Sequence, residues 1–255
     1  MPTQTLASAI ADRTTSLQPV VDLLSRGYVY PALSRYNSEF APRYFGRPPS
    51  EPIPTLARLL TTFRGRLGSL IEYGLGVTIG EALERDFGDA MKLSIETVNQ
   101  YPDYYLRGRD FEPLLRIDCK VYHHASDERS ARFDLPIAAI QPANDLLMYV
   151  AWDWRTLTYR GAAVKYPHLH AAVLVPAICL ARERDLRTAK VGGYFDTAGL
   201  PRAVPKLPGK PRDKWEVDSN FGKIDRLIHS SRKTADLEES VQAFVAFLSA
   251  NVPEA

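Results

Sequence analysis

Cysteine is scarce in this sequence. Only Cys119 and Cys179 occur among its 255 residues, and both lie within apolar stretches. Two such thiols do not supply the disulfide framework of a small secreted protein, and they suit a reducing compartment better. We therefore expect free thiols and a cytoplasmic protein, with Cys119 as a small apolar core residue.

Long apolar runs are missing as well. No stretch reaches the roughly 18 apolar residues that a helix needs to cross a bilayer. Residues 1–10 also lack the basic patch and apolar centre of a signal peptide. Hydrophobic residues nevertheless make up 45% of the chain, a share that excludes global disorder. We expect a globular protein with a sizeable core and no membrane partner.

Several familiar cofactor and catalytic motifs are absent. The chain has no Walker loop and no nucleophile elbow, and its glycines at 74–80 depart from the dinucleotide-binding spacing. Two histidine pairs occur, His123–His124 and His168 with His170, but no cysteine or third histidine completes a zinc spacing beside them. We therefore expect these histidines to be ordinary surface residues.

A strong charge of either sign is also missing, because 32 basic and 30 acidic side chains leave a formal net charge of +2. The charges are nevertheless segregated along the chain. Residues 201–235 hold nine basic and four acidic side chains, whereas residues 236–255 hold four acidic side chains and no basic one. The small net charge therefore does not exclude an anionic partner such as DNA.

The apolar pattern predicts one mixed α/β domain over residues 1–255. Helical spacing is typical of residues 1–35, 55–85 and 235–251. Strand patterns cover residues 92–98, 101–106, 114–122 and 146–154. The Pro-rich residues 28–54 are expected to form a surface loop. The C-terminal helix is expected either to form a dimer interface or to pack on its own domain.

The strand around residue 118 carries the chemistry. Alternation places Asp118 and Lys120 on one face of this strand. The polar loop 107–113 is centred on Asp110, and an antiparallel hairpin about that centre brings Asp103 beside Asp118. Two adjacent carboxylates repel each other, and a divalent cation such as Mg²⁺ stabilises both as anions. The alternative is a surface ion pair between Asp118 and Lys120.

A further candidate acidic side chain, Glu72, lies on the predicted long helix. Glu72 shares one face of it with small residues, namely Gly65, Gly68, Ser69 and Gly76. Each helical glycine costs about 1 kcal/mol relative to alanine, so such a face suits the close approach of another backbone or of a ligand. Glu81 and Glu84 lie on the same helix and are alternatives for the role of Glu72, which is otherwise a solvated surface acid.

The segments Pro102-Asp103 and Asp118-Cys119-Lys120 resemble the motif of the PD-(D/E)xK nuclease superfamily, most closely that of Type II restriction endonucleases. The resemblance covers about residues 65–155. It implies a restriction-endonuclease-like mixed central β-sheet flanked by helices, with a catalytic core at about 55–180. It also implies that Asp103, Asp118 and the Cys119 carbonyl bind Mg²⁺, that Lys120 is the catalytic lysine and that Glu72 is an auxiliary acid. Lys120 would orient or deprotonate the attacking water, or stabilise charge on phosphorus.

The expected activity is Mg²⁺-dependent, site-specific hydrolysis of double-stranded DNA by a homodimer, with a protective DNA methyltransferase as partner. The basic segment at about 200–233 would contact the DNA backbone. Its expected DNA-binding residues are Lys206, Lys210, Arg212, Lys214, Asn220 and Lys223. Asn220 is either a base-reading amide or a turn residue. The alternatives are a non-catalytic DNA-binding or regulatory protein, a repair nuclease for structured DNA and, for the basic segment alone, a solvated linker.

Overall fold

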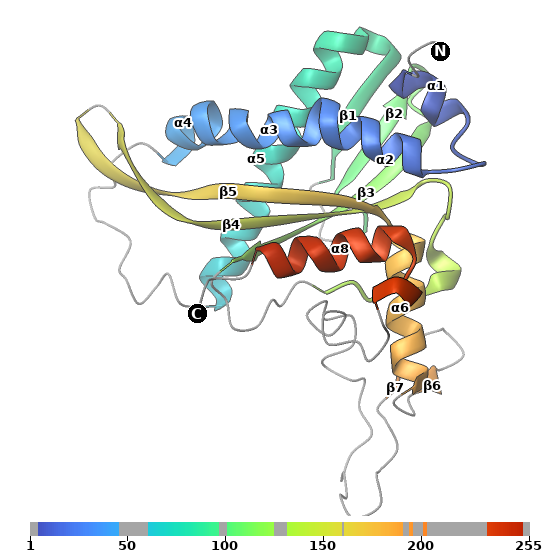
Figure 1. The fold of residues 1–255 in the computed structure, drawn as a ribbon. Coiled ribbons are helices and arrows are strands. Elements are labelled where there is room, and N and C mark those ends of the chain that lie inside the picture. Colours follow the sequence, from blue (N-terminus) through green and yellow to red (C-terminus); the bar gives the residue numbers. More distant parts are fainter. Residues whose placement is uncertain are drawn as a thin grey trace, which may run out of the picture.

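The computed structural model describes residues 5–45, 61–96, 101–124, 132–159, 161–190, 194–195, 201–202 and 234–251. Within them a five-stranded sheet forms the centre, and helices cover both of its faces (Figure 1). The fold is therefore α/β, as the sequence pattern predicts. Among the described residues, no helix combines the length and the apolar character that crossing a membrane requires.

The central sheet is mixed and has the strand order β1-β2-β3-β4-β5. Its strands are β1 (Met91–Ile95), β2 (Tyr104–Gly108), β3 (Pro113–His123), β4 (Asp145–Tyr159) and β5 (Ala162–Pro176). The only parallel neighbours among them are β3 and β4, and the other pairs are antiparallel. Two short strands, β6 (Tyr194–Phe195) and β7 (Pro201–Arg202), form a separate pair.

Four short helices at the N-terminus follow one another along one face of the sheet (Figure 1). They are α1 (Leu6–Ala11), α2 (Gln18–Leu24), α3 (Tyr30–Arg35) and α4 (Ala41–Phe45). Turns of π-helix, Ser25–Val29 and Tyr36–Phe40, join the last three without a break.

This helical run corrects the prediction of a loop over residues 28–54, as far as Phe45. The prolines there do not interrupt it, because Pro31 and Pro42 are each the second residue of a short helix that follows a π-helical turn. At the first turn of a helix the missing proline N–H is tolerated.

The remaining helices of the described residues are α5 (Thr61–Phe87), α6 (Ala177–Lys190) and α8 (Glu239–Ala250). Short 3₁₀ turns lie at Gly88–Ala90, Ile137–Ala139 and Thr234–Asp236. The described part of α5 agrees with the predicted long helix, although Leu70, expected on its core-facing stripe, is 54% exposed.

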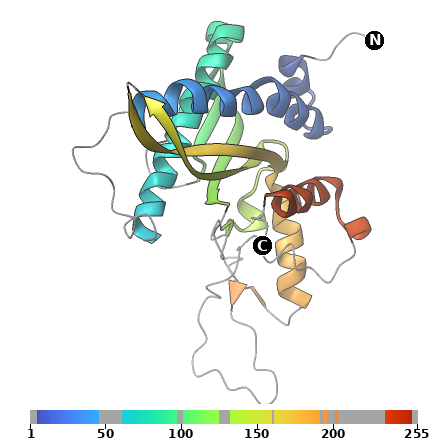
Figure 2. The same cartoon turned by 60° about the vertical axis from the view of Figure 1, so that its left-hand side comes forward.

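The core consists of two apolar clusters, one on each face of the sheet. Side chains of α1–α5 pack on the face that contains Ile117 and Cys119. Side chains of α6 and α8 pack on the opposite face, against Tyr122 and Tyr149. Figure 2 shows the N-terminal helices on one side of the sheet and α6 and α8 on the other.

The C-terminal helix buries its apolar face in its own chain, since Val241, Phe244 and Leu248 are all almost fully covered. Of the two alternatives for this helix, packing on its own domain is the one observed. A dimer interface built on these apolar positions is thereby excluded.

Candidate active site

The β2–β3 hairpin brings the two halves of the Pro102-Asp103 and Asp118-Lys120 pattern together. Tyr104 pairs with Ile117, so that the register places Asp103 beside Asp118, as predicted. A shift of register between Leu106 and Arg107 accounts for the difference of one residue from a symmetric hairpin about Asp110. The Cys119 backbone N–H donates a 2.6 Å hydrogen bond to Asp103 Oδ2, which fixes this carboxylate against β3.

Asp118 and Lys120 form an ion pair, with Lys120 Nζ 2.7 Å from Asp118 Oδ2. Only 6% of the Asp118 side chain and 26% of the Lys120 side chain are exposed. The pair therefore lies largely within the protein, and the alternative of a surface ion pair is excluded. Asp118 Oδ2 has the ammonium beside it but makes no hydrogen bond of good geometry to any of the described residues.

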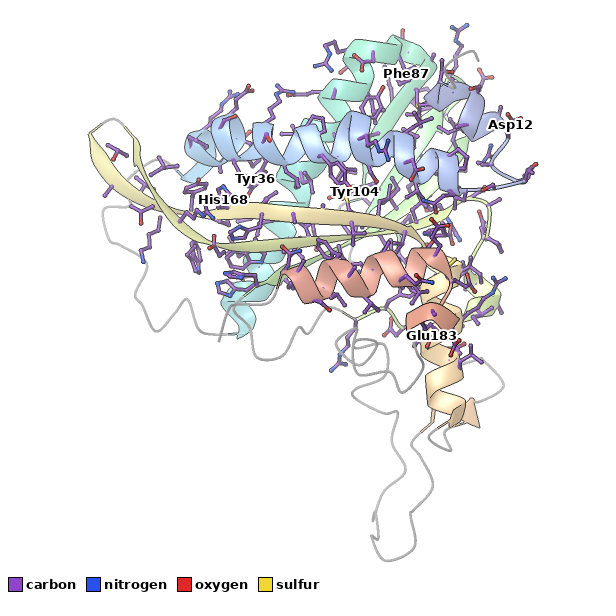
Figure 3. All side chains as sticks on the ribbon, in the orientation of Figure 1. Asp12, Tyr36, Phe87, Tyr104, His168 and Glu183 are labelled. Carbon is purple, nitrogen blue, oxygen red and sulfur yellow. The ribbon has the colours of Figure 1, made fainter. Side chains whose placement is uncertain are left out.

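Glu72 approaches the same group from α5. Tyr104, labelled in Figure 3, donates a 2.6 Å hydrogen bond from its hydroxyl to the Glu72 carbonyl and so ties α5 to β2. The glycines of this helix make the approach close. A Cβ on Gly68 would lie 3.1 Å from Val121 Cγ2, and one on Gly76 would lie 2.8 Å from Tyr104 Cε1. Gly68 and Gly76 of the small face therefore pack on the sheet, whereas Ser69 is exposed.

The alternative helix acids do not share this environment. Glu81 pairs with Arg35 at 2.5 Å and is half exposed, and Glu84 is exposed. Of Glu72, Glu81 and Glu84, Glu72 is the one whose charge interacts with Asp103, Asp118 and Lys120.

Burial raises the pKa of both acids. For Glu72, burial and the neighbouring Asp103 raise the carboxyl pKa to about 7, against the attraction of Lys120. For Asp118, burial raises the pKa to about 6, again with Lys120 opposing and Asp103 adding to the shift. Burial lowers the Lys120 pKa, but attraction to Asp118, Asp103 and Glu72 outweighs it and the net direction is upward. Lys120 is therefore a cation at neutral pH.

A buried ion pair that the sequence patterns do not predict lies beside this site. Arg116 Nε and Nη2 each donate a 2.5 Å hydrogen bond to the fully buried Asp145 carboxylate, and the Gln141 backbone N–H donates to it at 2.8 Å. The Tyr101 ring lies 5.2 Å from the Arg116 guanidinium carbon. This pair braces the chain next to Pro102-Asp103. Alternation along β3 does place Arg116 on the same face as Asp118. Its partner Asp145, however, belongs to β4, and local spacing does not predict that β4 lies parallel to β3.

The donor chemistry of this site fits Mg²⁺, which prefers carboxylate oxygens and keeps several waters. Asp103 and Asp118 supply such oxygens, and the buried Asp118 Oδ2 already lies beside one cation, the Lys120 ammonium at 2.7 Å. Glu72 does not complete a compact trio with them. Within the described residues, the one trio of such side chains whose ligand atoms all lie within 4.8 Å is His124, Asp153 and His170. The Cys119 carbonyl as a further ligand stays a prediction.

The expected DNA-contact residues lie outside the described residues. They are Lys206, Lys210, Arg212, Lys214, Asn220 and Lys223. Their role therefore also stays a prediction.

Comparisons of the chain with protein-family models, curated proteins and solved structures find no match. A function for this protein is therefore inferred from the chemistry of its side chains.

Proposed function

We propose that this protein is a Mg²⁺-dependent endonuclease that hydrolyses phosphodiester bonds of double-stranded DNA, of the site-specific restriction type. One observation carries the proposal. Asp103, Asp118 and Lys120 meet on adjacent strands of the sheet in the order and spacing of the PD-(D/E)xK pattern, with the Asp118–Lys120 pair largely buried. The restriction-endonuclease-like fold belongs to the same proposal.

Asp103 and Asp118 are the metal ligands in this proposal, and the Cys119 carbonyl is a third. The Cys119 N–H holds Asp103 in place at 2.6 Å. Bound Mg²⁺ would polarise the scissile phosphate and lower the pKa of water at the site. Magnesium bound between the two carboxylates would also favour their ionised forms, against the effect of burial on the Asp118 pKa.

Lys120 acts as a fixed positive charge. Its raised pKa keeps the ammonium protonated at neutral pH, which suits stabilisation of the charge that develops on phosphorus and does not suit proton abstraction. Glu72, with a pKa of about 7, is the better proton acceptor for the attacking water. Water oxygen would bond to phosphorus as the bond to the leaving sugar oxygen breaks. The proton of the attacking water would pass to Glu72, and the leaving oxygen would take a proton from solvent water.

The basic segment at about 200–233 would bind the DNA backbone, and two copies of the chain would cut the two strands. A DNA methyltransferase that protects the host sequence would be the cellular partner in the cytoplasm. These assignments rest on the charge distribution of the sequence and on the motif resemblance.

Plasmid cleavage tests the proposal. The purified protein is incubated with supercoiled plasmid and Mg²⁺, and the reaction is repeated with a chelator in excess. We expect discrete fragments with Mg²⁺, none with the chelator, and none from a folded Lys120→Ala variant. Cleavage by Lys120→Ala at the wild-type rate would show that the site is assigned wrongly.

A non-catalytic DNA-binding or regulatory protein is the second candidate, favoured by the surplus of five positive charges in residues 201–235. It predicts that the protein retards plasmid in a gel and leaves it intact at every Mg²⁺ concentration. A repair nuclease would instead cut branched DNA in preference to plain duplex. Both substrates therefore belong in the same assay.

A further inference from the structure

A second group of potential metal ligands lies at the end of β3, away from the proposed active site. His124 follows β3, Asp153 belongs to β4 and His170 belongs to β5. The carboxylate and imidazole ligand atoms of these three residues all lie within 4.8 Å of one another. His124 is six residues beyond Asp118, about 20 Å along the chain at the rise of a strand.

Backbone pairing sets the positions of the three side chains. The His124 N–H donates a 2.8 Å hydrogen bond to the Trp152 carbonyl, which places His124 next to Asp153. On β5, Ala171 pairs with Ala151 and Leu169 pairs with Trp152, so His170 is the extra residue of a β-bulge. Bulges often redirect a side chain toward a functional position.

The β4–β5 ribbon that carries the group extends well past the other strands (Figure 1). Figure 3 labels His168 on this ribbon, and its ring centroid is 5.1 Å from that of His170. The group therefore connects the end of β3 to the projecting ribbon.

The contacts within the group leave ligand atoms unsatisfied. His170 Nε2 lies 2.9 Å from Asp153 Oδ1, and His124 Nε2 lies 3.7 Å from Asp153 Oδ2. His170 Nε2 and Asp153 Oδ1 are buried, yet within the described part of the chain neither makes a hydrogen bond of good geometry. Two facing polar atoms without a hydrogen bond are what a bound cation would satisfy.

Other charged and titratable groups surround these ligands. Arg155 Nε lies 3.6 Å from Asp153 Oδ1, and Arg155 Nη2 lies 3.5 Å from His170 Nδ1. The Arg155 side chain is 52% exposed, so it can turn into solvent when a cation takes its place.

We propose that His124, Asp153 and His170 form a binding site for a divalent transition-metal cation of the Zn²⁺ class. Two imidazole nitrogens and one carboxylate oxygen are ligands that Zn²⁺ accepts, whereas Mg²⁺ requires oxygen ligands. Three protein ligands leave a position of the tetrahedral shell for water. The bound ion ties the end of β3 to the β4–β5 ribbon. This site is independent of the proposed nuclease activity.

Metal titration of the full-length protein tests the proposal. Chelator-treated protein is titrated with Zn²⁺ by calorimetry and with Co²⁺ by visible absorption, in the presence of millimolar Mg²⁺. We expect one equivalent to bind, with the absorption of a tetrahedral site and a higher melting temperature. Asp153→Asn and His170→Gln should each weaken binding by at least about tenfold.

Asp118→Asn is the matched control, because it makes the same change of acid to amide in the proposed Mg²⁺ site and should leave Zn²⁺ affinity unchanged. Circular dichroism of the metal-free variants checks their folding. If Asp153→Asn or His170→Gln does not fold, the Zn²⁺ affinity of His124→Gln is the deciding measurement. His124 lies just beyond the end of β3, so its substitution disturbs no strand. Absence of Zn²⁺ binding by the wild type, or wild-type affinity in the folded variants, would overturn the site without bearing on the nuclease proposal.

Discussion

Glu72 shows at the scale of one residue how the fold changes an ordinary side chain. In sequence it is one of several acids on a long helix, with nothing to mark it except the small residues on its face. In the fold its side chain on α5 is partly buried, and its charge interacts with those of Asp103, Asp118 and Lys120. An acid with a pKa near neutral pH is present there in both its protonated and its ionised form, whereas a solvated glutamate is almost entirely ionised.

The raised pKa of Glu72 predicts a dependence of stability on pH. The ordinary pKa is 4.5 and the folded value is about 7, so between them the folded chain binds more protons than the unfolded chain. The stability that this group contributes is fully present below about pH 4.5 and is lost as the pH rises through about 7. Glu72→Gln removes this loss. The unfolding free energy of Glu72→Gln, relative to that of the wild type, should therefore rise by on the order of 2 kcal/mol between about pH 5 and pH 8.

Urea unfolding in chelator at both pH values measures this difference. Glu81→Gln, on the same helix but half exposed, is the control and should show no comparable gain. A difference between Glu72→Gln and the wild type that stays constant with pH would contradict the assigned environment of Glu72.

At the scale of an element, α5 illustrates what a glycine permits. Gly76 lies where a Cβ would come within 2.8 Å of Tyr104 Cε1 and 3.0 Å of Ile95 Cδ1. The Tyr104 hydroxyl is held by the Glu72 carbonyl and cannot move away freely. At Gly80, one turn further on, a Cβ would meet Leu93 Cβ at an ordinary 3.6 Å.

Two alanine substitutions on α5 should therefore act in opposite directions. Gly76→Ala overpacks the contact with β2 and should destabilise the protein by about 1–3 kcal/mol. Gly80→Ala fits without crowding and should stabilise it by up to about 1 kcal/mol, since alanine is the better helix former. Denaturant midpoints of the two variants measure both effects. Equal effects of the two substitutions would show that the helix does not approach the sheet as closely as described.

Local patterns predict the elements of this chain better than their arrangement. The strands near 92–98 and 114–122 and the C-terminal helix are confirmed, because alternation and helical spacing act over a few residues. The register of Asp103 beside Asp118 also follows from one short loop. The long reach of β5 and the helices beyond residue 35 do not follow from these patterns, because a bulge in β5 and the π-helical turn Tyr36–Phe40 add residues that break the regular period.

The partners of a buried charge are set by the whole molecule. The pairing of Arg116 with Asp145 requires β3 and β4 to lie side by side in parallel, 29 residues apart in sequence. The grouping of His124 with Asp153 and His170 requires three strands at once. A search for a third histidine or cysteine misses this group, because its third member is an aspartate on the neighbouring strand.

The charge distribution of the whole chain also bears on function. Its net charge of +2 combines a basic segment, an acidic tail and an acidic group at the end of the β2–β3 hairpin. Binding of Mg²⁺ at Asp103 and Asp118 would offset part of this negative charge and favour the approach of phosphate. The two metal sites proposed differ in ligand type, so Mg²⁺ should not displace Zn²⁺ from His124, Asp153 and His170.

Cleavage of plasmid by Asp118→Asn tests the central claim most directly. Asp110→Asn is the matched control, because it makes the same change at an exposed position in the loop of the same hairpin. With Mg²⁺ present, we expect Asp110→Asn to cut at the wild-type rate and folded Asp118→Asn to cut at least about a hundredfold more slowly. Wild-type cleavage by folded Asp118→Asn would contradict the account.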